Sequence, residues 1–315
     1  MIPFRGCQSI DPERRLHLRI GVIDLAVESD LEEIIKDLGA LYGDFHKDPL
    51  PAGNPRDIVM QVKAICRVLP CRRRYAVLGD GKALWTARGL NEVLPYVEWG
   101  INWRVIARYP EFLQIHAATL ARSGGGLMLV AESGLGKSTL AAALFARGWS
   151  YLSDEFALID PDRLVLEPFP KALCIKSGSF ALVEGLGLPI RRGRHYVKSL
   201  KGEVGYVSPM ARGPGGLAGS TPVRFVVFPR YVENAEPRLY PISRAQAAFH
   251  LAGHALNRHV FGVRTLSILG RIVRGARCYV LDAGSIGKTC DLLDRMAASQ
   301  VESLSRSDDR IRRSA

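Results

Sequence analysis

Several features that would define a class of protein are missing from this sequence. It has no run of about 18 consecutive apolar residues, the length that a membrane-spanning helix needs. The N-terminus lacks the apolar core of a secretory signal, so we expect a cytoplasmic protein without a membrane partner. The six cysteines form no Cys-x-x-Cys pair, and no second ligand pair follows Cys66 and Cys71 at zinc spacing. These absences predict reduced, mostly buried thiols.

Acidic residues are fewer than basic ones. The chain has 43 Lys and Arg against 31 Asp and Glu, which gives a formal net charge of +12. The densest basic runs, 72–74 and 191–194, are not interleaved with aromatic residues as a surface for single-stranded nucleic acid would be. We therefore predict bound phosphates or an acidic partner as the counterpart of this charge, and no nucleic acid. Assembly into a homo-oligomer stays open.

Hydrophobic periodicity divides the chain into three parts. Residues 1–95 predict a small α+β region, with a strand-like start, a helical stretch over 30–45 and a Gly-Asp-Gly hairpin signal within 75–87. Residues 96–300 predict an α/β domain with a mixed sheet around a glycine-rich loop. The last segment, 301–315, has dense charge and little to bury, so we expect it to be disordered.

One glycine of the Walker A pattern is absent from LMLVAESGLGKSTLAAALFARGW, residues 127–149. Ala131 replaces it, a substitution that is tolerated where φ stays negative. The stretch is otherwise a strand, a glycine-rich loop and a helix, whose backbone N–H groups surround phosphate oxygens while the lysine reaches the β- and γ-phosphates and the hydroxyl binds Mg²⁺. It therefore predicts ATP and Mg²⁺ as ligands. The candidate binding residues are Ser133, Gly134, Leu135, Gly136, Lys137, Ser138 and Thr139.

Other motifs narrow the type of nucleotide site. The NKxD motif of GTPases is absent, and a second Gly-Lys-Thr at 284–289 has glycines too close together to surround a phosphate, so we expect Lys288 to be an ordinary helix-start residue. Asp154 and Glu155 follow an apolar run soon after the loop. Acids beside a triphosphate bind Mg²⁺ or accept a proton from an attacking hydroxyl. The alternative is that they cap a turn.

In this order of motifs the chain resembles HPr kinase/phosphorylase, the bacterial protein-serine kinases whose nucleotide-binding core is shared with phosphoenolpyruvate carboxykinase. His116 opens a hairpin (IHAATLARSGGGLMLV), the loop SGLGKS follows, the helix ends in RGW, and LSDE stands where the family has two aspartates. The resemblance is greatest to the branch called HprK-related kinase A and extends over most of the chain.

The resemblance implies a role for each matched residue. Asp154 would accept the serine proton, Glu155 with Ser138 would hold Mg²⁺, His116 would orient the acid, and Lys137 would bind the phosphates. Glu155 departs from the family's aspartate, Thr139 replaces a glutamate, and Glu184 stands where the bifunctional enzymes have an arginine. These departures favour a kinase without phosphorolysis, whose acceptor is not the family's usual sugar-transport phosphocarrier. We expect the acceptor to be a small protein or peptide.

Two other interpretations of the residues stay open. One is a small-molecule kinase acting on free serine or a sugar, and the other is a binding module in which the nucleotide only controls a partner contact. Lys176, at the end of a short strand, is a further candidate for a phosphoryl contact, although a solvated role is favoured. His250 and His254, four apart on one expected helix with His259, are favoured as structural residues over zinc ligands.

Overall fold

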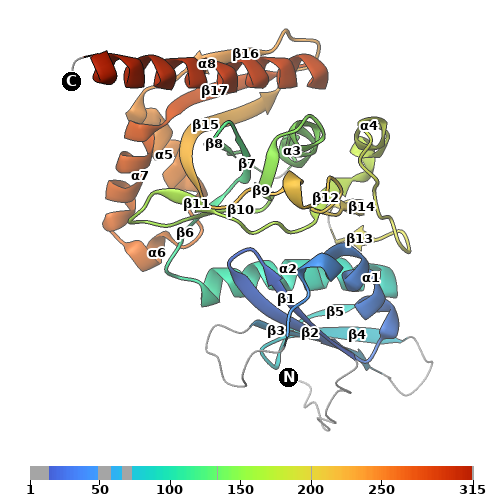
Figure 1. The fold of residues 1–315 in the computed structure, drawn as a ribbon. Helices are drawn as coiled ribbons and strands as arrows, with labels where there is room; N and C mark the ends of the chain where they lie inside the picture. Colours follow the sequence, from blue (N-terminus) through green and yellow to red (C-terminus); the bar gives the residue numbers. More distant parts are fainter. Residues whose placement is uncertain (1–13, 49–57, 66–72, 133, 200, 314–315) are drawn as a thin grey trace. The chain divides into compact units, whose positions relative to one another are not determined.

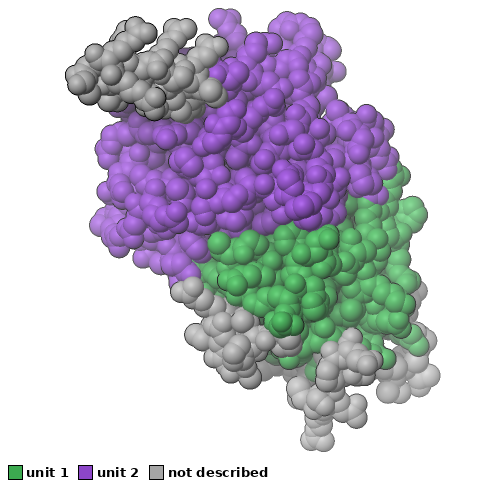
Figure 2. Space-filling model, in the orientation of Figure 1, with its two compact units in different colours: residues 1–109, 191–206 green, residues 110–190, 207–315 purple. Residues whose placement is uncertain are grey.

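The computed structural model of this mixed α/β protein describes residues 14–48, 58–65, 73–132, 134–199 and 201–313, with side chains up to residue 299. Contacts divide the chain into two compact units, the first made of 1–109 and 191–206 and the second of 110–190 and 207–315 (Figure 2). The division therefore falls after Tyr109 and not at the expected residue 95, which lies inside helix α2 (Leu90–Arg108). Within the described part of the chain, no helix is both long and apolar enough to cross a membrane.

The first unit contains a mixed sheet of strand order β1-β2-β3-β4-β5, in which only the β2–β3 pairing is parallel. The strands are β1 (Arg15–Ile20), β2 (Ile23–Ser29), β3 (Ile58–Ile65), β4 (Arg74–Gly79) and β5 (Lys82–Ala87). Also in this unit are α1 (Glu32–Tyr42), the 3₁₀ helix η2 (Gly43–Phe45), α2, β13 (Val197–Lys198) and, up to Tyr206, its partner β14 (Gly202–Val207).

Local chemistry explains the helix and the hairpin of this unit. Asp80 and Gly81 both have positive φ, 49° and 75°, as the tight turn between β4 and β5 requires, so the Gly-Asp-Gly signal is confirmed. Helix α2 buries Val93, Val97 and Ile101, which lie four residues apart and so share one face. The expected boundary at residue 95 would divide this helix between the two units.

The second unit is built around a larger mixed sheet of path β6-β10-β11-β15-β8-β7-β9, with β17 on β15 and β16 on β17. Strand β15 pairs in parallel with both β8 and β17 and thus lies at the centre. The strands of this sheet are β6 (Leu113–His116), β7 (Ala118–Arg122), β8 (Gly125–Leu129), β9 (Ser150–Ser153), β10 (Phe156–Ile159), β11 (Val165–Glu167), β15 (Thr221–Tyr231), β16 (Arg238–Pro241) and β17 (Arg277–Ala283). Strand β12 (Leu173–Lys176) belongs to this unit but lies outside the sheet. The helices are α3 (Lys137–Ala146), η3 (Ser177–Ser179), α4 (Phe180–Gly185), η4 (Pro214–Gly216), α5 (Arg244–His254), α6 (Arg258–Phe261), α7 (Arg264–Gly275) and α8 (Ile286–Arg313).

Alternation along the central strands buries both faces of this sheet. On β8, Leu127 and Leu129 join the apolar cluster that contains α3 and the first turns of α8. Met128 and the following Val130 join a separate cluster that contains α5 and α7. Figure 1 shows the helices on the two sides of the sheet. Because successive strand side chains point to opposite faces, a continuous apolar run is what such a doubly covered strand requires.

Two expectations about helices are wrong. The segment from residue 301 was expected to be disordered, but α8 continues through it to Arg313. Helix propagation needs little beyond a formed and packed start, which Cys290, Leu293 and Met296 provide. The three histidines were expected on one helix, but α5 ends at His254, and His259 belongs to α6.

Candidate active site

The glycine-rich loop leads into α3 through two glycines with positive φ. Gly134 and Gly136 have φ of 105° and 81°, values that suit glycine, and Gly136 is the N-cap of α3. The Leu140 N–H donates to the Gly136 carbonyl at 2.9 Å, which closes the first turn. Ala131 is buried and does not have a positive φ, so a methyl group is accepted in place of the missing glycine. Ser133 lies outside the described residues.

Lys137 and His116 meet beside this loop. The lysine is the first residue of α3 and only 6% exposed, and its Nζ lies 3.0 Å from His116 Nε2. With the lysine charged, its ammonium group donates and the imidazole accepts at Nε2, which corresponds to the tautomer with its proton on Nδ1. His116 ends β6 and does not open the β7–β8 hairpin as expected, because the chain changes sheet partners at Ala117.

The pair of acids, Asp154 and Glu155, lies close to the strand end that carries His116. Asp154 and Glu155 form the bend between β9 and β10, where the Phe156 N–H donates to Ser153 Oγ at 3.3 Å. Strand pairing sets Phe156 opposite His116 and Ser153 opposite Thr119. The two acids therefore lie beside the β6–β7 junction that carries His116.

Burial distinguishes the two acids. Asp154 is only 3% exposed, whereas Glu155 is half-buried. A buried carboxylate next to a lysine–histidine pair suits proton transfer, since water is largely excluded from it. The more open carboxylate suits a metal that also touches a substrate.

The donor set fits Mg²⁺ bound to phosphates better than a metal held by protein alone. Among the described residues, no three His, Cys, Asp or Glu side chains are grouped to hold a metal ion. Mg²⁺ is usually held by one or two carboxylates, waters and substrate phosphates. Ser138, half-buried in the first turn of α3, and Glu155 are the residues that would supply the protein oxygens.

The end of β12 and the following η3 lie close to the glycine-rich loop and the first turn of α3. Thr139 Oγ1 and Ser179 Oγ lie 2.9 Å apart. Lys176 Nζ lies 3.6 Å from the position that a Cβ on Gly134 would take, so its ammonium group reaches the loop from outside α3. Lys176, the further candidate from the sequence, is thus near the glycine-rich loop.

His254 is a neighbour that the sequence analysis did not assign to the site. Burial is the main cause that lowers its pKa below the ordinary 6.5, and the charges of Lys137 and His250 lower it further, while Glu132 acts in the opposite direction. The end of α5 is held to β6 by the bridge between Ile115 and Ala255. The four-residue spacing of His250 and His254 was the available signal, but it did not indicate which strand the helix end would meet.

This lowered pKa predicts a loss of stability in acid. Between the folded and unfolded pKa values, the unfolded chain binds a proton at His254 and the folded protein does not, so unfolding is favoured as pH falls below about 6.5. We expect the urea midpoint of His254→Asn to fall less between pH 7.5 and 5.5 than that of the wild type. His259→Asn, at an exposed position on α6, is the matched control and should follow the wild type. If the urea midpoints of wild type and His254→Asn fall equally between pH 7.5 and 5.5, the prediction is contradicted.

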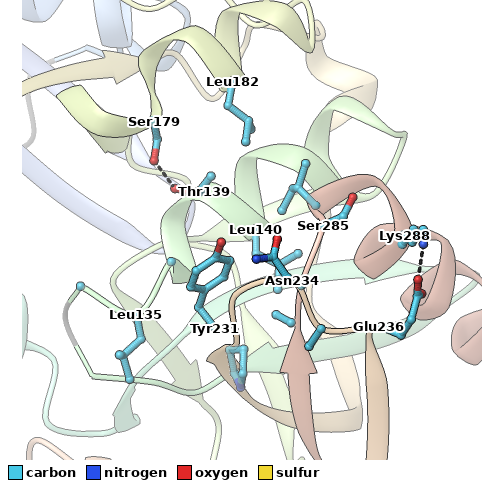
Figure 3. Close-up of a pocket in the computed structure, with 17 residues that line it drawn as sticks. Leu135, Thr139, Leu140, Ser179, Leu182, Tyr231, Asn234, Glu236, Ser285 and Lys288 are labelled. Atoms are coloured by element: carbon cyan, nitrogen blue, oxygen red, sulfur yellow. Dashed lines mark hydrogen bonds and ion pairs between the residues drawn. The ribbon is translucent and has the colours of Figure 1, made fainter.

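A cavity of about 690 Å³ opens beside the phosphate loop (Figure 3). One side is formed by Gly134, Gly136 and Thr139, from the loop and the first turn of α3. The opposite side comes from the loop after β15 and from the start of α8, which includes the second Gly-Lys-Thr segment. Lys288 is indeed in the first turn of α8, and it forms an ion pair with Glu236 at the cavity.

Comparison with known proteins shows a distant structural likeness. No family model and no curated protein matches the sequence. A solved structure, the Hpr(Ser) kinase/phosphatase from Coxiella burnetii, is similar with 12% identity and a TM-score of 0.31, over 61% of this chain and 98% of that one. Identity and TM-score at this level are too low to assign the chain to that enzyme's family.

Proposed function

We propose that this protein is an HPr kinase-like enzyme of the HprK-related kinase A type, which transfers the γ-phosphate of ATP to a serine hydroxyl on a small protein or peptide. The observation that carries the proposal is the contact of Lys137, at the start of a glycine-loop helix, with His116, whose strand partner directly follows Asp154 and Glu155. The proposal assigns phosphate binding to Lys137, proton acceptance to Asp154 and metal binding to Glu155.

Each group has one task in the transfer. The acceptor hydroxyl gives its proton to the Asp154 carboxylate while its oxygen forms a bond to the γ-phosphorus. The bond from that phosphorus to the β,γ-bridging oxygen breaks, and ADP leaves. Lys137 neutralises charge on the phosphoryl oxygens, and His116 positions the lysine through the 3.0 Å hydrogen bond. Mg²⁺, bound by Ser138 and Glu155, would supply further charge neutralisation at the phosphates.

The assay that tests this function is transfer of γ-labelled phosphate from ATP to proteins of a source-cell lysate. Label in a small protein or peptide, stable to conditions that hydrolyse phosphohistidine, is the expected result. Label only in a metabolite would replace the proposal with a small-molecule kinase. ATP binding without any transfer would favour a nucleotide-controlled binding module.

Glu155→Gln should raise the Mg²⁺ concentration needed for half-maximal transfer by about 10-fold, because a neutral amide is a weaker ligand for a hard cation. The measurement is initial rate against free Mg²⁺, and chelation with EDTA should abolish transfer in both proteins. Glu184→Gln, at an exposed position on α4, is the control and should leave the Mg²⁺ curve unchanged. If the dependence of rate on Mg²⁺ is the same for Glu155→Gln and the wild type, Glu155 is not a ligand of the metal.

A further inference from the structure

The cavity beside the phosphate loop has exposed apolar walls. Three large hydrophobic side chains converge on it: Tyr231, 64% exposed, Leu135, 45% exposed, and Leu182, 37% exposed. They come from β15, the phosphate loop and α4, three segments far apart in the sequence. Convergent exposed apolar groups around a concavity of this volume are typical of a small-molecule site.

The cavity is continuous with the place where phosphates would bind. Thr139, two residues after the loop lysine, lines it, whereas Lys137 contacts His116. Phosphates at the start of α3 would thus have the reacting end at Lys137 and the remainder of the ligand on the Thr139 side. Lys176, near Gly134, adds a positive charge to the loop where the phosphates pass.

The segment that follows Tyr231 is held in position by its neighbours. The Val232 N–H donates to the Ala283 carbonyl at 2.9 Å. A Cβ on Gly284 would come within 1.9 Å of the Ala235 carbonyl oxygen, so only glycine allows this close approach. The first glycine of the second Gly-Lys-Thr segment therefore has a structural role: it supports the cavity wall and does not bind a phosphate itself.

We propose that this cavity binds the nucleoside of ATP, with the base stacked on the ring of Tyr231 and its polar edge toward the amide of Asn234. The proposal rests on the proposed function, because it takes the phosphate loop as the triphosphate site. In Figure 3 the Tyr231 ring and the Asn234 amide both project into the space below Thr139 and Leu182. An aromatic face stacks on a base, and a carboxamide pairs with the adjacent donor and acceptor of adenine.

The test compares ATP with inorganic tripolyphosphate, which has the phosphates but no nucleoside. Binding of each to the full-length protein with Mg²⁺ is measured by calorimetry. Tyr231→Ala should weaken ATP binding by about 10- to 100-fold, the effect of losing one stacked base, and leave tripolyphosphate binding unchanged. Tyr231→Phe keeps the ring and should retain the wild-type affinity for ATP.

The controls separate this proposal from the proposed function. Tyr240→Ala removes an exposed tyrosine on β16, outside the cavity lining, and should alter neither affinity. Lys137→Ala should weaken both ligands. If wild type binds tripolyphosphate as tightly as ATP, or if Tyr231→Ala weakens both equally, the nucleoside site is wrong while the phosphate loop stands. If wild type binds neither ligand, the proposed function itself fails.

Discussion

Lys137→Ala should reduce phosphate transfer from ATP by about a thousandfold or more, because the charge that it places on the phosphoryl oxygens has no substitute within α3. The side chain is buried and directed at His116, so a truncated residue also leaves the imidazole without this hydrogen-bonded neighbour. The rate is measured with γ-labelled ATP and the acceptor found in the lysate assay. Lys36→Ala, at an exposed lysine of α1 paired with Glu32, should keep the wild-type rate.

The second prediction concerns Asp154→Asn, which is measured in the same transfer assay. Loss of a positioned proton acceptor should cost about 100- to 10,000-fold in turnover while nucleotide binding persists. Asp162→Asn, in the exposed turn between β10 and β11, is the matched control. Transfer that survives in Asp154→Asn at the wild-type rate would show that this buried carboxylate is not the base. Loss of ATP binding in the same variant would point to a structural role instead.

Trp149→Ala should lower the free energy of unfolding by about 3–5 kcal/mol, the usual cost of removing a fully buried large aromatic side chain. The indole lies in the core cluster between α3 and α8, and its Nε1–H donates to Asp294 Oδ1 at 2.7 Å. The same carboxylate accepts from Arg122 and Arg147, so the variant also removes one donor from a shared acceptor. The tryptophan thus holds α8 against the helix that begins at the phosphate loop.

Urea unfolding followed by far-ultraviolet circular dichroism measures this change. Trp103→Ala is the control, since Trp103 is 55% exposed on α2 and its loss should change stability by no more than about 0.5 kcal/mol. If Trp149→Ala has the urea midpoint of the wild type, neighbouring side chains must fill the space between α3 and α8 without loss of stability. That result would contradict a packing role for the Arg-Gly-Trp end of the helix.

Local sequence patterns predicted the elements that carry the site. The order of apolar run, glycine pair and alanine-rich run predicted β8, the loop and α3, and Gly148, with φ of 99°, confirms the expected end of that helix. The position of His116 on a strand and the bend at Asp154 were also within reach, since both depend on a few neighbouring residues. These elements can be predicted from short segments because backbone φ and hydrophobic alternation depend on residues within one or two turns of one another.

Local sequence patterns could not predict the division into two units or the cavity wall opposite the glycine-rich loop. The apolar face of α2 predicts a buried helix but does not name the sheet that buries it, and segment 191–206 joins the first unit only through long-range packing. Likewise, a carbonyl oxygen from a distant part of the sequence has no local signature, so the need for a glycine at Gly284, against Ala235, appears only once the two loops meet.

The sequence by itself thus determined the strand, the glycine-rich loop and the helix that begins at Lys137, and it named Asp154, Glu155 and His116 as candidate site residues. Only the tertiary structure decided that Lys137 touches His116, that Lys176 reaches the loop, that His254 is a neighbour, and that Tyr231 lines a cavity beside Thr139. The physical reason is that strand pairing and helix packing join residues far apart in the chain, and their energies depend on surfaces that no single segment contains.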